Sequence, residues 1–230
     1  MTDTSADNAA AYAYTAGHAT QLRFDPDEAT RTLAAADPTL GRLMARVGAF
    51  APRTVAAPDA FHALLRAIVY QQLSGKAAAT IHRRLLDALG GGATPGATRI
   101  AAADDATLRG AGLSQNKMLS LQALAAAQIN GELPDESALD DSHDAELIER
   151  YSAIRGIGRW TVEMLLLFHL GRPDVMPIHD LGVRKGYART YGHDELPKPK
   201  QLERECEIWR PYRSVGSWYM WRATEIDDLR

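Results

Sequence analysis

Two glycines separated by one residue, followed by an isolated aspartate, are the residues whose types and spacing most clearly suggest chemistry. Gly156 and Gly158 lie between two helical patterns, and glycines permit φ > 0 and lack Cβ atoms, so another chain can approach the turn closely. The second pattern begins at Arg159, and the N–H groups of Gly158, Trp160 and Thr161 are expected to be unsatisfied at the positive end of the helix dipole. The turn is therefore predicted to bind phosphate through Gly156, Gly158 and Thr161. A glycine corner between helices is also a common structural device.

The aspartate is Asp180, which directly precedes a helical pattern beginning at Leu181. A carboxylate in a partly desolvated site stabilises positive charge on a reacting sugar or orients an attacking water. The same residue in the same place is also a good N-cap, whose oxygen accepts N–H bonds from the helix. Both interpretations are compatible with the sequence.

The elements that must position these residues are predicted to be helices. Glycine and proline punctuate nearly every junction, and no alternating strand pattern of useful length occurs. We therefore expect an all-α fold. Helices are predicted over residues 27–36, 38–47, 59–70, 76–89, 95–102, 104–109, 115–129, 144–154, 159–170, 181–191, 198–207 and 210–226.

Composition sets limits on the class of protein. The chain has 230 residues, 46% of them hydrophobic, which is enough for a substantial core. It has no apolar run long enough for a membrane span, and its acidic N-terminus lacks signal-peptide features, so we expect a cytoplasmic monomer, nucleoid-associated if bacterial. The net charge of −3 is unlike a typical nucleic-acid binder, but residues 150–189 carry seven Arg/Lys against three acids. A solvated face of mixed charge is the alternative interpretation.

The order L-x-x-[I/L]-x-G-I-G-x-W-T, followed by an apolar helix and D-V-x-P-x-x-D-L-G-[I/V], resembles the helix-hairpin-helix DNA glycosylases. It is most similar to their 3-methyladenine DNA glycosylase II branch, over roughly residues 55–225. The resemblance implies two helical lobes with the helix-hairpin-helix, about 147–170, at the interlobe cleft. A central bundle would comprise 56–173, a terminal lobe would comprise 21–55 plus 174–230, and 1–20 would form a flexible arm.

The activity implied by the resemblance is excision of alkylated bases from double-stranded DNA, by base flipping and hydrolysis of the N-glycosidic bond, in base excision repair. Asp180 would be the catalytic carboxylate. Relatives that also cut the backbone have a Schiff-base lysine where this chain has Trp160, so a monofunctional enzyme without lyase activity is expected.

The base pocket implied by the family includes Trp160 and Trp221, with Trp218 as a competitor for the second position. An electron-rich ring attracts a cationic alkylated purine. Aromatic residues at helical spacing are equally typical of a core. Met164 replaces a frequent family tyrosine, and Arg222 follows Trp221 where a tyrosine can occur, which leaves the substrate range open.

The DNA contacts implied by the family begin with an intercalating wedge, Gln72, with Leu73 beside it and Ser74 probing the minor groove. An ordinary polar turn with Leu73 packed inward is the alternative. Lys117, Arg155 and Arg159 are candidate phosphate neighbours or simple surface charges.

No cofactor is expected except Na⁺ or K⁺ at the hairpin, held in this family by backbone carbonyls, here those of Ser152, Ile154 and Ile157. The single cysteine, Cys206, excludes the four-cysteine iron–sulfur loop of some relatives.

Two rival functions remain at this point. Helix-hairpin-helix units also serve as non-catalytic DNA-binding modules, which need neither the carboxylate nor an aromatic pocket. A lyase-type glycosylase for oxidised bases is disfavoured by Trp160.

Overall fold

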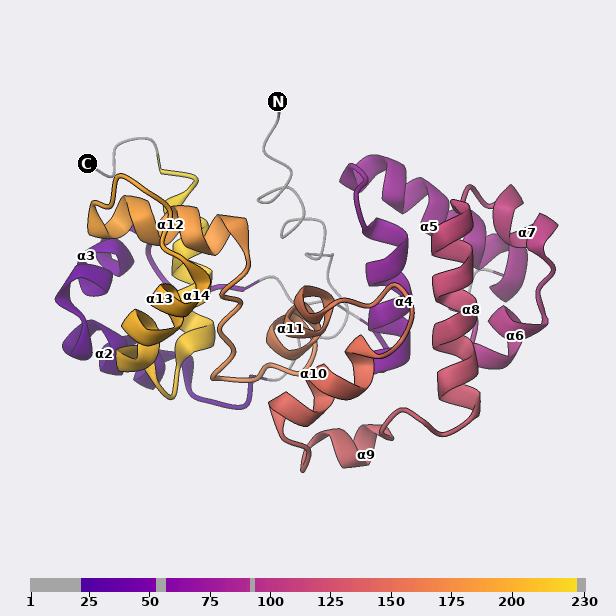
Figure 1. Ribbon diagram of the computed structural model, residues 1–230, viewed down its shortest axis with the longest axis horizontal. Helices are drawn as coiled ribbons and strands as arrows, with labels where there is room; N and C mark the ends of the chain where they lie inside the picture. The colour runs from indigo at the N-terminus through magenta and orange to yellow at the C-terminus, as the bar shows by residue number, and fades with distance from the viewer. Residues whose placement is uncertain (1–21, 53–56, 92–93, 227–230) are drawn as a thin grey trace. The chain divides into compact units, whose positions relative to one another are not determined.

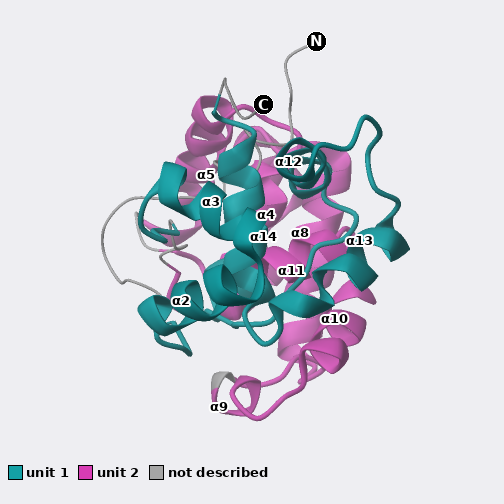
Figure 2. Cartoon of the chain, turned by 90° about the vertical axis from the view of Figure 1, so that its left-hand side faces the viewer, with its two compact units in different colours: residues 1–6, 20–54, 166–230 teal, residues 7–19, 55–165 magenta. Residues whose placement is uncertain are grey.

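The computed structural model describes residues 22–52, 57–91 and 94–226, and the predicted arm at 1–20 lies outside them. All regular elements in these ranges are helices (Figure 1). The predicted all-α class is therefore confirmed. Two compact units are present, coloured separately in Figure 2: unit 1 contains the described residues of 20–54 and 166–230, and unit 2 those of 55–165.

Unit 1 is built around α14 (Arg213–Ala223), which packs against α12 (Leu181–Tyr191) and α3 (Pro38–Val47). Nine of the eleven residues of α14 are buried, so this helix forms the centre of the unit. A Cβ on Gly186 would overlap the carbonyl of Met220, so the glycine allows the α12 and α14 backbones to touch. The remaining elements are α2 (Pro26–Ala36), α13 (Pro199–Glu205) and a 3₁₀ turn (Cys206–Trp209).

A half-buried carboxylate connects three of these elements. Asp37 caps α3 by accepting N–H bonds from Thr39 and Leu40, each 3.0 Å long. Its other oxygen accepts the Trp209 Nε1–H at 2.9 Å and the Tyr191 hydroxyl. These hydrogen bonds lower the pKa of Asp37 despite its partial burial, which by itself would raise it.

Unit 2 is organised around α4 (Ala60–Tyr70), which packs against α5 (Gly75–Gly90) and α8 (Gln115–Ile129). Ten of its eleven residues are buried, so α4 is a core helix rather than one with a single apolar face. The other helices are α6 (Ala97–Ala102), α7 (Asp105–Gly110), α9 (Glu136–Leu139), α10 (Asp144–Ser152) and α11 (Arg159–Phe168), whose last residues belong to unit 1.

Helix ends differ from the predicted ones where turns are tight. α10 ends at Ser152 and α11 at Phe168, each two residues earlier than predicted, because turns ending at the left-handed Gly156 and Gly171 follow them. The short α9 is not predicted from the sequence, since four residues carry no periodicity.

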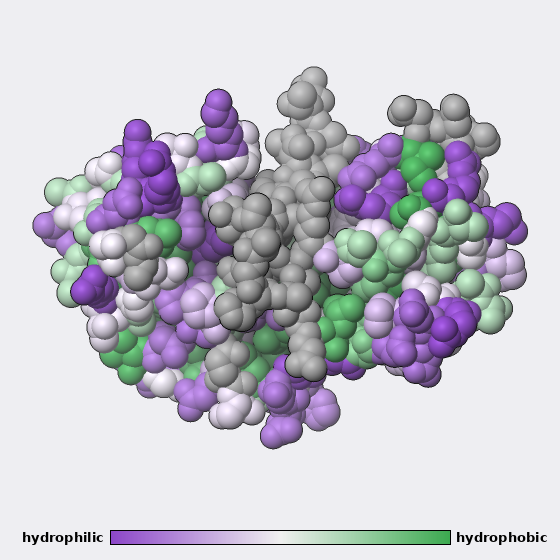
Figure 3. Space-filling view, turned by 180° about the vertical axis from the view of Figure 1, so that it is seen from behind, coloured by the Kyte–Doolittle hydropathy of each residue, from purple (hydrophilic) through white to green (hydrophobic). Residues whose placement is uncertain are grey.

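The described surface offers few large apolar side chains. Outside the grey atoms, green patches in Figure 3 are separated by purple hydrophilic side chains. No helix among the described residues is long and apolar enough to cross a membrane. The exposed large hydrophobic residues are Ile129, Leu181, Leu196 and Ile208.

Candidate functional site

Asp180 is a buried carboxylate with two defined donors in unit 1. It precedes α12, and its Oδ1 accepts the N–H of Val183 at 2.7 Å and the indole N–H of Trp221 at 2.8 Å. The residue is only 4% exposed. Asp180 is therefore an N-cap, as its local pattern allows, and also the partner of an aromatic side chain 41 positions away. Charge-assisted bonds of this kind hold a carboxylate in one orientation.

Gly182 makes the contact between Trp221 and Asp180 possible. A Cβ at this position would lie 2.7 Å from Trp221 Cδ1 and 3.1 Å from Asp180 Oδ1. The first distance is below van der Waals contact, so any larger residue would displace the indole. Sequence reasoning missed this role, although the Asp-Leu-Gly order contains the signal.

An apolar hollow in unit 1 has Trp221 in its wall. The rings of Phe168 and Trp221 lie 5.6 Å apart, and the ring of Phe50 meets Trp218 edge-on at 5.2 Å. Trp218 and Trp221, competitors in the sequence, thus line the same hollow, and Phe24 and Phe50 join them from a segment not predicted to contribute. The lining residues are Leu22, Phe24, Phe50, Pro52, Leu167, Phe168, Arg172, Ser214, Trp218 and Trp221.

The two glycines of the hairpin in unit 2 serve different purposes. Gly156 has φ +80°, and a Cβ there would overlap the Ser120 side chain. Gly158 has no positive φ, and a Cβ there would meet nothing within 4 Å. Gly156 therefore shapes the turn, whereas Gly158 leaves open space in front of α11.

The N–H donors expected at this turn are only partly as predicted. Thr161 donates its N–H to the Gly158 carbonyl at 2.9 Å and is 4% exposed, so the prediction that this N–H is unsatisfied is wrong. The physical reason is that Gly158 occupies the cap position and its carbonyl begins the helical bonding pattern. The N–H groups of Gly158 and Arg159 make no backbone hydrogen bond within the described ranges. These two donors are therefore the better candidates for binding an anion.

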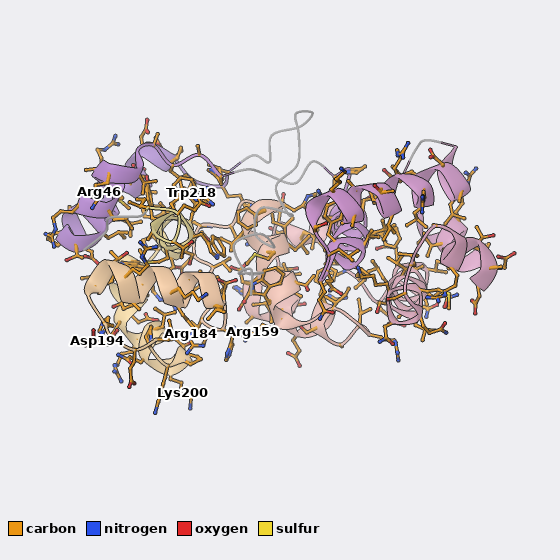
Figure 4. The ribbon with its side chains drawn as sticks, turned by 90° about the horizontal axis from the view of Figure 1, so that it is seen from above. Arg46, Arg159, Arg184, Asp194, Lys200 and Trp218 are labelled. Carbon is orange, nitrogen blue, oxygen red and sulfur yellow. The ribbon has the colours of Figure 1, made fainter. Side chains whose placement is uncertain are left out.

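The first turns of α11 hold the other predicted residues of the hairpin. Arg159, labelled in Figure 4, is 54% exposed and pairs through Nε with Glu163 Oε1 at 2.8 Å. The buried Glu163 therefore offsets part of the Arg159 charge. Trp160 is half-buried and Met164 is fully buried. Their roles in a base pocket stay predictions.

The α4–α5 turn presents the predicted wedge. Gln72 is exposed and has φ +55°, a left-handed conformation that costs a non-glycine residue on the order of 1 kcal/mol. Leu73 is half-buried, and Ser74 caps α5 through its Oγ, 3.4 Å from Ala77 N. A strained backbone at an exposed residue is a reason to look for function there.

Two long-range bonds, which the sequence did not reveal, join this turn to its neighbours in unit 2. Gln71 Nε2 donates to the Gly156 carbonyl at 3.1 Å, and Lys117 Nζ donates to the Val69 carbonyl at 2.7 Å. Partial burial lowers the pKa of Lys117. Lys117 is thus more than a surface charge, because it caps the end of α4.

The sequence of this chain is similar to those of known DNA repair proteins. Residues 65–211 match the model of the HhH-GPD superfamily of base excision DNA repair proteins. The chain is 36% identical over 197 residues to DNA-3-methyladenine glycosylase 1 of Schizosaccharomyces pombe, covering 85% of this chain and 86% of that protein. The chain belongs to the HhH-GPD superfamily.

Solved structures agree with this assignment. A Schizosaccharomyces pombe 3-methyladenine DNA glycosylase in complex with abasic DNA has a TM-score of 0.78 and 36% identity, covering 87% of this chain and 98% of that one. A DNA-3-methyladenine glycosidase from Bacillus halodurans also has a TM-score of 0.78, with 34% identity over 87% of this chain and 91% of that one. The resemblance predicted from the hairpin and the aspartate is confirmed.

The hairpin of this HhH-GPD protein also presents the carbonyls considered for a cation. The Ile154 carbonyl accepts the Ile157 N–H at 3.1 Å and keeps one lone pair for another ligand. Carbonyl oxygens are suitable ligands for hard cations. A cluster of His, Cys, Asp and Glu able to hold a metal does not occur in the described part of the chain. Na⁺ or K⁺ at Ser152, Ile154 and Ile157 stays a prediction.

Proposed function

We propose that this HhH-GPD protein is a monofunctional DNA glycosylase that removes alkylated bases of the 3-methyladenine type from double-stranded DNA. The observation that carries the proposal is the buried Asp180, held by the Trp221 indole at the wall of an aromatic hollow. A buried carboxylate beside aromatic rings suits a substrate that is flat and cationic.

The reaction assigned to this site is hydrolysis. As the C1′–N bond of the flipped nucleotide lengthens, positive charge develops on the sugar, and the Asp180 carboxylate stabilises it. The bonding electrons leave with the base, which departs neutral because alkylation had made it cationic. Water adds its oxygen to C1′ and gives one proton to the carboxylate, which returns it to solvent. The products are the free base and an abasic site.

We expect no strand cleavage because of the residue at position 160. A lyase step needs an amine that forms a Schiff base with C1′, and the Trp160 indole cannot do this. Trp160 is proposed instead to contribute to base binding.

DNA binding is assigned to unit 2. The proposed phosphate ligands are the N–H groups at Gly158 and Arg159, and Gln72 is the proposed wedge. Na⁺ or K⁺ held by the carbonyls of Ser152, Ile154 and Ile157 would add positive charge toward the same phosphate. We further propose that the protein acts as a monomer.

The rival function, a DNA clamp without catalysis, needs neither the carboxylate nor an aromatic hollow, although Asp180 would still cap α12. An excision assay separates the two. Duplexes carrying one alkylated or deaminated purine, or 8-oxoguanine as the oxidised control, are incubated with the protein, and released base and nicked strand are measured before and after alkali. Base release with nicks only after alkali is expected for the alkylated purine. No base release from any alkylated duplex, with DNA binding intact, would favour the clamp.

A further inference from the structure

The segment that leads to Asp180 in unit 1 is buried without being helical. Residues 169–180 connect α11 to α12, and residues 175–178 within this segment are all buried. A buried loop must satisfy its backbone N–H and C=O groups through other parts of the protein. The partners of this segment therefore show what holds Asp180 in place.

The helix α14 supplies several of those partners. The Ser214 hydroxyl accepts the Val175 N–H at 2.9 Å and donates to the Arg172 carbonyl at 2.6 Å. The Ser217 hydroxyl lies 3.4 Å from the Val175 carbonyl and 3.3 Å from the Met176 sulfur. Side chains of α14 therefore contact both backbone polar groups of Val175.

The same face of α14 also reaches Asp180. Ser214, Ser217 and Trp221 are spaced by three and four positions, so their side chains lie on one side of the helix. Their contacts follow the order of the segment, because the two serines meet Val175 and the indole N–H of Trp221 meets Asp180. One helix face thus holds the segment at two points.

The segment in turn stabilises the start of α14. Tyr212, at the cap position of this helix, makes no side-chain cap bond. The first N–H groups are bonded by the segment instead, Arg213 to Asp174 Oδ1 at 3.4 Å and Ser214 to the Pro173 carbonyl at 2.9 Å. A cation at a helix N-terminus is unfavourable, and the Asp174 carboxylate offsets it by accepting two guanidinium bonds from Arg213, at 2.7 and 3.0 Å. Each element therefore fixes the position of the other.

We propose that Ser214 is a positioning residue for excision, which holds the segment so that the Asp180 carboxylate stays at one position in the site. This role rests on the proposed function of Asp180. Trp221 fixes the side chain of Asp180, whereas Ser214 fixes the backbone that leads to it. A carboxylate held at both points does not have to reorganise as charge develops on the sugar. A displacement of about 1 Å can lower a rate about 100-fold.

The first experiment measures the segment itself, without DNA. Amide hydrogen exchange is followed by NMR on the full chain labelled at valine. Two valines report the relevant bonds, Val175 through its N–H bond to Ser214 and Val183 through its N–H bond to Asp180. Both amides should exchange faster in Ser214→Ala than in the wild type, because local opening of the segment becomes easier.

The matched control is Tyr219→Phe. Tyr219 lies on the other side of α14 and donates its hydroxyl to the Gly48 carbonyl at 2.9 Å, so this variant removes a hydroxyl bond from the same helix. It should leave both valine amides and the single-turnover excision of an alkylated purine at their wild-type rates. Ser214→Ala should lower the excision rate about 10-fold with unchanged affinity for the duplex.

A double-mutant cycle separates positioning from a general loss of structure. If Ser214 acts through Asp180, Ser214→Ala should lower excision in the wild-type background but not in Asp180→Asn, where the charge to be positioned is already absent. A smaller folded fraction would lower excision by the same factor in both backgrounds. Ser217→Ala removes the longer contact to Val175 and should show the same pattern with a smaller loss. If Ser214→Ala does not fold, the measurements on Ser217→Ala decide.

Three results would overturn the proposal. One is wild-type excision by Ser214→Ala, and another is an equal loss of excision in the two backgrounds. The third is faster exchange at Val175 alone, with Val183 as protected as in the wild type. Failure of the proposed function would look different. The wild type would then release no alkylated base, or Asp180→Asn would excise at the wild-type rate, while the exchange of both valines would still respond to Ser214→Ala.

Discussion

Asp180→Asn is the most direct test of the carboxylate. This substitution separates the role of Asp180 as a helix cap from its proposed catalytic role. Both hydrogen bonds described above end on Oδ1, so an asparagine whose carbonyl oxygen occupies that position keeps the Val183 and Trp221 donors. Two charge-assisted bonds become neutral ones, which costs roughly 1 kcal/mol each, while the cost of burying a charge disappears. The net change in unfolding free energy should therefore be about 1 kcal/mol or less.

The effect on excision should be much larger. Loss of one preorganised electrostatic group lowers turnover on the order of 100-fold or more, which corresponds to about 3 kcal/mol of transition-state stabilisation. Single-turnover excision, duplex affinity and thermal unfolding are measured on the same preparation. Affinity for undamaged DNA should persist, since the proposed phosphate ligands lie in unit 2.

Asp180→Ala provides the structural reference. It removes both acceptor bonds from buried donors and should lower stability by about 2–4 kcal/mol, in addition to abolishing excision. The catalytic assignment fails if Asp180→Asn excises at the wild-type rate. It also fails if the activity of Asp180→Asn falls only as far as its folded fraction.

The remaining predictions concern the hairpin, the nucleophile and pH. Gly158→Asp and Gly158→Asn both provide a cap for α11 in open space, so both variants should fold. Only the aspartate should weaken binding to every duplex, as measured by fluorescence anisotropy. Equal affinities of the two variants would mean that the hairpin does not touch phosphate. Borohydride should trap no covalent enzyme–DNA adduct, because Trp160 provides no amine. An adduct seen on a denaturing gel would point to another amine. Lys185 is the lysine nearest to Asp180 in the sequence. Burial, with a contribution from Arg66, lowers the pKa of His82 from 6.5 to about 4. Between these values the unfolded chain binds a proton that the folded chain does not, so stability should fall by about 3 kcal/mol as pH drops from 6.5 to 4, as measured by denaturant titration. His82→Gln should flatten this dependence, and an unchanged slope would assign it to other groups.

Helix positions follow from local sequence, although several ends differ from the predicted ones by two or three residues. Asp25, Asp37 and Asp180 accept N–H bonds within three residues of themselves, and such caps need no tertiary contact. Gly156 was predicted to allow a left-handed turn and has one. Gly158 does not use the positive φ that glycine permits, and its missing side chain leaves open space at the start of α11.

The candidate site could be predicted only in part. Asp180 and Trp221 were selected from a motif and from spacing, but the bond between them spans 41 positions, and nothing in either neighbourhood indicates it. Phe24 and Phe50 were missed because an aromatic residue in a segment without a motif is indistinguishable from a core residue. The sequence did not distinguish Arg155 from Arg159 as candidate phosphate neighbours. In the structure Arg159 pairs with Glu163, which reduces the charge it can offer to DNA.

The sequence alone determines the order of the helices, their caps, the glycine turn and the presence of Trp160 where some relatives have a Schiff-base lysine. These features together indicate the superfamily. These features depend on neighbours a few positions away, where backbone geometry sets the distances. Tertiary structure alone decides that Gly182 admits the Trp221 indole, that Gln71 reaches the Gly156 carbonyl across 85 positions, and that Ser214 accepts the Val175 N–H across 39 positions. Those contacts arise from how helices pack, and packing depends on the shapes of surfaces that are remote in the sequence.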